Sequence, residues 1–116
     1  MIRKACADDI IVFDDEFVKG MANTRRIAID GTEMIEISEL FVDPFFQHQG
    51  IAGKLMLEIE AQSKLTGICD IFLWVLEKNS EAIHFYERYD FVPTGERKLE
   101  EGTSEYILKY AKKIPL

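Results

Sequence analysis

The feature that most constrains this chain is a strand-like run that leads through a short glycine loop directly into a helix-like segment. Residues 34–42 alternate in polarity and then become fully apolar, which is typical of a strand that enters the centre of a sheet. Gly50 and Gly53 follow, and residues 50–66 carry apolar side chains at helical spacing. Residues 71–76 then form a continuous apolar run of strand length. Strand, helix and strand in this order predict a βαβ unit with a right-handed crossover.

The remaining segments read as further strands and one more helix around this unit. Asn79 and Ser80 are residue types that cap helix N-termini, so a helix is expected over residues 81–89. Short runs at residues 10–13, 17–22 and 26–29 precede the βαβ unit, two closing strands are expected at residues 91–97 and 103–111, and the expected order is β-β-β-α-β-α-β-β. The predicted fold class is α/β, with a mixed, mostly antiparallel central sheet around the βαβ unit. No repeat or linker interrupts the chain, so a single domain over residues 1–116 is expected.

The chain is acidic, with 21 Asp and Glu against 14 Lys and Arg and a formal net charge of -7. This charge disfavours nucleic acid and anionic membranes as partners and favours a cationic one, such as an amine. Cys6 and Cys69 do not form a CxxC pair, which is typical of reduced thiols in an intracellular protein. Without a secretory signal pattern or an apolar run of about 20 residues, a cytoplasmic location is expected. His48 and His84 have no partner at metal-ligand spacing, so no metal is expected.

The glycine loop has the properties of an anion site. The first amides of a helix lack intrahelical acceptors, and the helix dipole adds partial positive charge at the same end. Gly50 lets the backbone approach a phosphate without a Cβ in between, and Ala52 and Gly53 keep the next positions small. His48 and Lys54 stand at the rim as further donors. A turn that merely caps a helix explains Gly50 equally well, whereas the spacings of the P-loop and of the dinucleotide-binding loop do not match.

Two sequence blocks carry a resemblance to a known family. The stretch QHQGIA at residues 47–52 resembles the Q/R-x-x-G-x-G/A signature of the GCN5-related N-acetyltransferase (GNAT) superfamily, and LFVDP at residues 40–44 is similar to the strand end before it. The family's second block, N-x-x-A-x-x-x-Y-x-x-x-G-F, is matched at Asn79, Ala82, Tyr86 and Phe91. The usual glycine of this block is Asp90 here, and a left-handed backbone would cost Asp of order 1 kcal/mol. The resemblance covers about residue 10 to the end of the chain.

The resemblance implies that acetyl-CoA is the co-substrate. The backbone of residues 40–42 should pair with the pantetheine arm like an added strand, and the amides of residues 48–53 should hold the pyrophosphate. Asn79 should contact the arm where the two central strands separate. The residues implied in cofactor binding are Leu40, Phe41, Val42, Gln47, His48, Gln49, Gly50, Ile51, Ala52, Gly53, Lys54 and Asn79.

The same resemblance implies catalytic roles for one tyrosine and one glutamate. Tyr86 stands at the position of the family's general acid, and a phenol with a pKa of about 10 is protonated at neutral pH and can donate to the departing thiolate. Glu36 stands where some members carry a general base, with Glu39 in reserve and a water-relayed base as a further alternative. Trp74 stands where other members use a glutamate, which excludes that version. Without the resemblance, Tyr86 reads as a core aromatic and Glu36 as a residue on the solvated face of a strand.

The expected function is therefore transfer of an acetyl group from acetyl-CoA to a primary amine by direct attack in a ternary complex, with a backbone N–H near Val42 stabilising the thioester oxygen. Family members carry a first strand and one or two helices ahead of the strand at residues 10–13, and residues 1–9 are too few to build them. The acceptor pocket is therefore expected to be open, or to be completed by a second chain in a homodimer. The alternatives are a non-catalytic acyl-CoA-binding module and a subunit that needs a partner chain to complete its acceptor site.

Overall fold

The computed structural model describes the backbone of residues 2–3, 9–14, 17–42 and 50–115 and the side chains of residues 20–41 and 50–115. Within this part of the chain, two helices accompany a seven-stranded sheet. The elements in chain order are β1 (Ile2–Arg3), β2 (Asp9–Asp14), β3 (Phe17–Ile29), β4 (Thr32–Val42), α1 (Ile51–Thr66), β5 (Asp70–Leu76), α2 (Ser80–Arg88), β6 (Val92–Leu99) and β7 (Tyr106–Lys113). The predicted α/β class with a mixed, mostly antiparallel sheet is confirmed.

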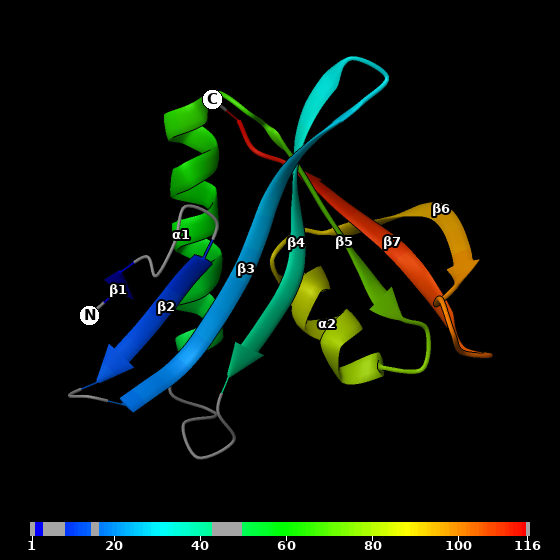
Figure 1. Ribbon diagram of the computed structural model, residues 1–116, viewed down its shortest axis with the longest axis horizontal. Helices are drawn as coiled ribbons and strands as arrows, with labels where there is room; N and C mark the ends of the chain where they lie inside the picture. The colour runs from blue at the N-terminus through cyan, green and yellow to red at the C-terminus, as the bar shows by residue number, and fades with distance from the viewer. Residues whose placement is uncertain (1, 4–8, 15–16, 43–49, 116) are drawn as a thin grey trace.

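The strand order across the sheet is β1-β2-β3-β4-β5-β7-β6. β4 and β5 are parallel neighbours connected through α1, which confirms the predicted βαβ unit, and the other neighbouring pairs of the described sheet are antiparallel. Figure 1 shows β4 and β5 diverging downwards with α2 between them. The segments predicted at residues 17–22 and 26–29 form one strand, β3, because pairing with β4 continues across a register shift. Residues 2–3, for which the sequence pattern predicts no element, pair with β2 as β1.

α1 packs its apolar side against the sheet, as its helical spacing predicts. The helix begins directly after Gly50 and ends before Gly67, within one residue of the predicted bounds. The buried aliphatic side chains of the helix are Ile51, Leu55, Met56 and Ile59. Burial of each such side chain contributes about 1.5–3 kcal/mol to stability. Not every apolar residue of the helix belongs to this buried side, because Leu57 lies on the outer side and is 65% exposed.

The C-terminal end of α2 is closed by a pair of backbone hydrogen bonds. The amide of Asp90 donates to the carbonyl of Glu87 at 3.1 Å, and the amide of Phe91 donates to the carbonyl of Tyr86 at 3.1 Å. These are the two bonds of a Schellman motif, in which the residue directly after the C-cap has a left-handed backbone. Asp90 has a φ of 68°, so this aspartate adopts the conformation that the family's glycine would adopt. The motif presses Phe91 against Tyr86, with their ring centroids 5.8 Å apart.

The two faces of the sheet differ in character. Both helices contribute to one apolar core, into which alternate residues of the central strands point, among them Ile35, Ile37 and Leu73. The residues between them face the opposite side, where Glu36 of β4 forms an ion pair with its cross-strand neighbour Arg25 of β3. The helices therefore cover one face of the sheet, and the other face carries polar and aromatic side chains.

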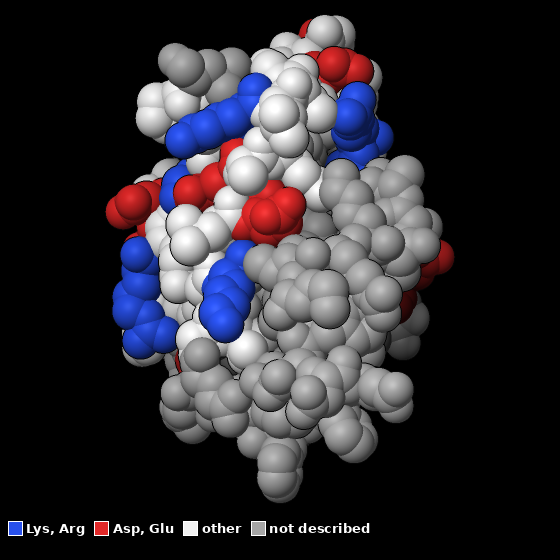
Figure 2. All heavy atoms as spheres, turned by 90° about the vertical axis from the view of Figure 1, so that its left-hand side faces the viewer, with Lys and Arg blue, Asp and Glu red and all other residues white. Residues whose placement is uncertain are grey.

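The described surface shows no strong segregation of charge on the side that Figure 2 presents. Lys and Arg side chains are interspersed there with Asp and Glu side chains. Neither described helix combines the length and the apolar character needed to cross a membrane. The described residues also contain no group of three or more His, Cys, Asp or Glu side chains placed to hold a metal ion.

Candidate functional site

The candidate site lies where β4 and β5 separate. Among the residues that the structure describes, these strands pair only at residues 35–37 with residues 71–73. β4 continues to Val42 and stays paired with β3 on its other side. On the side that faces β5, the backbone groups of residues 38–42 therefore have no strand partner within the described sheet. We call the gap between residues 38–42 and β5 the splay. Backbone groups at such an edge pair readily with an extended ligand.

Two cavities meet at the splay. The helix-side cavity, with a volume of about 500 Å³, lies between the first turn of α1 and α2. The strand-side cavity, also about 500 Å³, lies between β4 and β5 and reaches Met21 of β3. Four residues line both cavities: Leu40, Asn79, Ala82 and Tyr86. A long ligand can therefore extend from the start of α1 to the splay and meet a second ligand there.

The helix-side cavity ends on the backbone of the first turn of α1. Gly50 caps this helix without a side-chain hydrogen bond and has a left-handed φ of 74°. Among the described residues, no atom lies within 4 Å of a Cβ added at Gly50. The amide of Lys54 donates to the Gly50 carbonyl at 3.1 Å, and no described residue accepts from the amides of residues 51–53, which can therefore serve a ligand. These amides and the helix dipole suit a phosphate group.

The predicted loop residues differ in where they lie. Four of them line the helix-side cavity: Gly50, Ile51, Ala52 and Gly53. The Ile51 side chain is 2% exposed and belongs to the core, so this residue has only its backbone to offer a ligand. Lys54 is exposed and lines neither cavity. Three further residues of the prediction lie outside the described part of the chain: Gln47, His48 and Gln49.

A contact that sequence reasoning missed explains the second glycine of the loop. A Cβ at Gly53 would lie 2.6 Å from the hydroxyl oxygen of Tyr89. The side chain of Tyr89, the C-cap residue of α2, can reach α1 at this point because residue 53 has no side chain. Tyr89 also lines the helix-side cavity, beside Phe85 and Arg88 of α2. The sequence interpretation kept Gly53 small for a phosphate, and the structure adds the Tyr89 side chain as a reason.

The β4 residues of the prediction lie along the splay. Between the pairs Asn23–Glu39 and Thr24–Ile37 the register shifts, so that β4 carries one additional residue, Ser38. Through this bulge, Leu40 packs against the core on the helix side, as Ile37 does. Phe41 is 49% exposed and lines the strand-side cavity. Val42 ends β4, and its side chain lies outside the described residues.

Asn79 joins the end of β5 to α2. Its amide donates to the Leu76 carbonyl at 2.9 Å, and its side-chain oxygen accepts from the Ala82 amide at 3.1 Å. The second bond is the predicted N-cap. Asn79 therefore has a structural role, and its predicted contact with a cofactor arm stays a prediction that its place at both cavities supports.

Tyr86 occupies the junction of the two cavities. Its ring packs edge-on against Phe91 and against Phe85, at centroid distances of 5.8 and 5.4 Å. Burial raises the pKa of the Tyr86 phenol above its ordinary value of about 10. The phenol is therefore protonated throughout the neutral range and is held in a defined position, as a proton donor must be.

The two carboxylates considered as general bases have different surroundings. Glu36 is buried and accepts a hydrogen bond from Nε of Arg25, with side-chain exposures of 11% and 61%. The reading of Glu36 as a solvated strand residue is therefore wrong, because Arg25 and Phe72 flank it on the neighbouring strands. Glu36 lines neither cavity, whereas Glu39 lines the strand-side cavity. The structure thus brings Glu39 to the same cavity as Tyr86.

Comparison with known proteins places the chain in a family. A family model described as an acetyltransferase (GNAT) domain matches residues 6–93. An uncharacterised N-acetyltransferase of Methanocaldococcus jannaschii is 40% identical over 63 residues, which cover 54% of this chain and 28% of that protein. The match thus spans about a quarter of the curated relative's length. The chain belongs to the GNAT acetyltransferase family.

Solved structures share the fold. The NatC complex bound to Gag peptide and CoA contains a similar chain, with a TM-score of 0.82, 18% identity, and coverage of 92% of this chain and 71% of that chain. The PaiA N-acetyltransferase from Thermoplasma acidophilum, in complex with coenzyme A, has a TM-score of 0.68 and 27% identity, covering 90% of this chain and 59% of that chain.

Proposed function

We propose that this chain, as one domain over residues 1–116, transfers the acetyl group of acetyl-CoA to a primary amine by direct attack in a ternary complex. The observation that carries this proposal is the position of Tyr86, where a cavity that ends on helix amides meets a cavity that contains Glu39. The first cavity suits a thioester that carries phosphates, and the second suits an ammonium group. Both similar structures described above contain CoA, which supports the choice of donor.

The donor groups of the helix-side cavity fit CoA. A pyrophosphate would accept hydrogen bonds from the amides of residues 51–53, beside Gly50. The polar groups of the pantetheine arm would pair with the free backbone edge of residues 40–42, as an added strand does. Both sets of contacts use backbone groups, so they recognise the part of the molecule that every acyl-CoA shares.

The chemical step needs one proton donor and one proton acceptor at the splay. The bound ammonium group first gives one proton to a carboxylate or to water. The neutral amine nitrogen then attacks the thioester carbonyl carbon, the N–C bond forms, and the C–S bond breaks. Tyr86 gives its phenolic proton to the departing sulfur and regains a proton from solvent. The surplus proton of the amine nitrogen passes to a carboxylate or to water. A backbone N–H near Val42 would stabilise the charge that develops on the thioester oxygen.

The identity of the base can be tested with two matched variants. The family resemblance assigns this role to Glu36, while the lining of the strand-side cavity favours Glu39. Glu36→Gln and Glu39→Gln each remove one negative charge with little change in volume. Substitution of the base should lower kcat. The kcat of that variant should recover as the pH rises, because the amine then loses its proton without a base.

Calorimetric titration with acetyl-CoA tests the donor site. Gly50→Glu places a carboxylate at the start of α1 and should lower the affinity at least about a hundredfold, because charged hydrogen bonds contribute about 1.5–3 kcal/mol each. Gly102→Glu is the matched control, since Gly102 also has a left-handed φ, of 78°, with nothing within 4 Å of an added Cβ. This control variant should bind acetyl-CoA as the unchanged chain does.

The result separates the proposal from its alternatives. Equal loss of binding in both variants would show that backbone strain, not a phosphate site, is responsible. Binding of acetyl-CoA without acetyl transfer to any amine would indicate the non-catalytic acyl-CoA-binding module. No binding by the unchanged chain would overturn the proposed function for this chain on its own.

A further inference from the structure

The strand-side cavity opens on the sheet face away from the helices, and its opening is apolar. Met21 and Phe41 are cross-strand partners on β3 and β4, and both line this cavity. Trp74 and Leu76 of β5 line it from the other side. These four residues alternate along their strands with residues that face the core, such as Ala22 and Leu73. An incoming molecule therefore meets an aromatic and aliphatic surface before it reaches the splay.

One carboxylate stands in this apolar lining. Of the described residues that line the strand-side cavity, Glu39 alone is an Asp, Glu, Lys or Arg. Its neighbour Ser38 is engaged elsewhere, because its hydroxyl donates to the side-chain oxygen of Asn23 at 3.0 Å. The lining thus offers a single negative charge, which complements a single ammonium group and leaves a second one without a partner.

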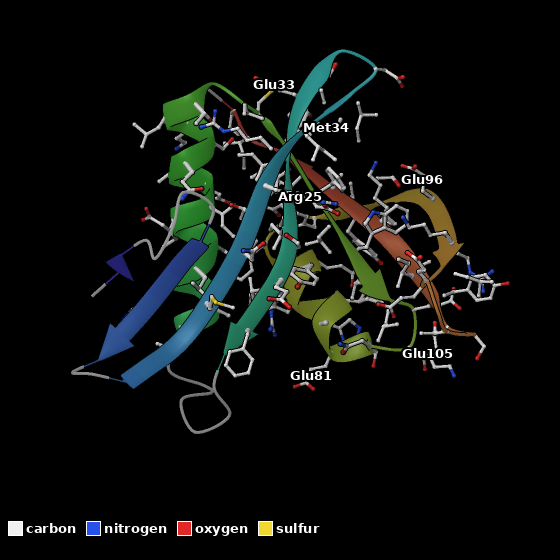
Figure 3. All side chains as sticks on the ribbon, in the orientation of Figure 1. Arg25, Glu33, Met34, Glu81, Glu96 and Glu105 are labelled. Atoms are coloured by element: carbon white, nitrogen blue, oxygen red, sulfur yellow. The ribbon has the colours of Figure 1, made fainter. Side chains whose placement is uncertain are left out.

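Positive charges flank this opening and are held in place. Lys109, the cross-strand neighbour of Trp74, pairs with Glu96 at 3.2 Å. Nζ of Lys98 lies 4.2 Å from the centroid of the Trp74 ring. Arg25 pairs with Glu36, and Figure 3 shows Arg25 well apart from Glu96, which is labelled beside β6. The glutamates in these two ion pairs are already engaged, so they offer no ready partner to a second ammonium group of an acceptor.

We propose that the acceptor is a primary amine that carries one positive charge next to an apolar group. Glu39 holds the ammonium, and Met21, Phe41 and Trp74 hold the apolar group. Polyamines and other multiply charged amines are then poor acceptors. This inference rests on the proposed function and names the acceptor class of the same site. An arylalkylamine and a peptide that begins with a large apolar residue both present this chemistry.

A panel of amines tests the proposal on the full chain. Release of the CoA thiol is followed with acetyl-CoA and each of five acceptors: 2-phenylethylamine, ethylamine, spermidine, Phe-Ala-Ala amide and Ser-Ala-Ala amide. Either acceptor with an aromatic group should exceed its matched partner in kcat/KM by about tenfold or more, the range that an apolar pocket provides. Comparison of kcat/KM for 2-phenylethylamine and for Phe-Ala-Ala amide shows whether the preferred acceptor is a small amine or a peptide N-terminus.

Two substitutions connect the preference to the opening. Phe41→Ala should lower the kcat/KM ratio of 2-phenylethylamine to ethylamine about tenfold. Leu65→Ala is the control, because Leu65 is an apolar residue of α1 that is 86% exposed and lines neither cavity. Met21→Glu adds a second carboxylate and should shift the preference toward spermidine.

The outcomes distinguish this inference from the proposed function. If acetyl-CoA binds and spermidine or ethylamine is acetylated as fast as 2-phenylethylamine, the inference is overturned and the acetyltransferase proposal stands. If Phe41→Ala leaves the kcat/KM ratio of 2-phenylethylamine to ethylamine unchanged, the apolar group of the acceptor does not bind at this opening, and the inference is again overturned. If no amine is acetylated, both proposals fail together.

Discussion

The two cavities that meet at Tyr86 are built in different ways. The helix-side cavity ends on one short stretch, residues 50–53, and it is this stretch that presents backbone amides and small side chains. The strand-side cavity is assembled from side chains of β3, β4, β5 and α2 that are distant in the sequence. A ligand that never changes can be bound through backbone groups, which few substitutions disturb. A variable ligand is selected by side chains, and their arrangement depends on the register of the sheet.

The largest expected difference between the cavities concerns Tyr86 itself. Tyr86→Phe removes the proton donor and should lower kcat about 100- to 10,000-fold, the usual range for general acid catalysis. Acetyl-CoA affinity should change less than about threefold, because the cofactor contacts are backbone groups of other residues. Steady-state kinetics and calorimetry measure the two quantities. An unchanged kcat would show that Tyr86 is only a core aromatic.

A smaller effect tests the contact between Tyr89 and α1. Gly53→Ala places a Cβ 2.6 Å from the Tyr89 hydroxyl oxygen, at the end of a side chain that has to shift, and should reduce the free energy of unfolding by about 1 kcal/mol. Tyr89→Phe removes that oxygen, and the next atom, Cζ, is 3.7 Å away, which is an ordinary contact. In the Tyr89→Phe background the same alanine should stabilise the helix by about 0.5–1 kcal/mol. Urea unfolding of the four chains checks this change of sign.

The C-terminus of α2 allows a still smaller test on the side of Tyr86. Asp90→Gly should increase the free energy of unfolding by about 1 kcal/mol, because glycine adopts the observed φ of 68° without a Cβ penalty. Asp90→Ala should move stability the other way, since alanine keeps the Cβ and lacks the polar group that lets Asp tolerate this conformation. Thermal unfolding of both variants measures the difference. Destabilisation by glycine would contradict the Schellman geometry.

The smallest effect is the response of the rate to pH. Since burial raises the pKa of Tyr86, ionisation of this donor should be confined to pH values above about 10. With saturating acetyl-CoA and 2-phenylethylamine, kcat should therefore hold or rise between pH 7.5 and 9.5. A fall in kcat within this interval, while circular dichroism shows the chain still folded, would mean that the acid is a group with a lower pKa.

Local patterns in the sequence predicted much of the fold. The bounds of α1 are correct within one residue because its apolar spacing and its two flanking glycines act over a few residues. The glycine that the family usually carries at the place of Asp90 indicated a left-handed position, and Asp90 has a φ of 68°. The glycine loop likewise pointed to an anion site at the start of α1, and the described loop residues do line a cavity there.

The lining of the strand-side cavity could not be predicted in this way. Simple alternation along β4 places Ile37 and Glu39 on one face and Leu40 on the other. The bulge at Ser38 reverses this, so that Leu40 joins the core and Glu39 lines the strand-side cavity. A bulge is stabilised by packing across the whole sheet, and no residue type at Ser38 requires it.

The sequence by itself determined the βαβ unit and the start and end of α1, because these follow from patterns between near neighbours in the chain. Only the tertiary structure decided that residues 2–3 pair as a strand, that the Tyr89 side chain reaches Gly53, that Arg25 holds Glu36, and that the strand-side cavity is lined as it is. These contacts join distant segments. Their formation depends on strand register and helix packing, which are set by the sum of many burial and pairing energies rather than by any local pattern.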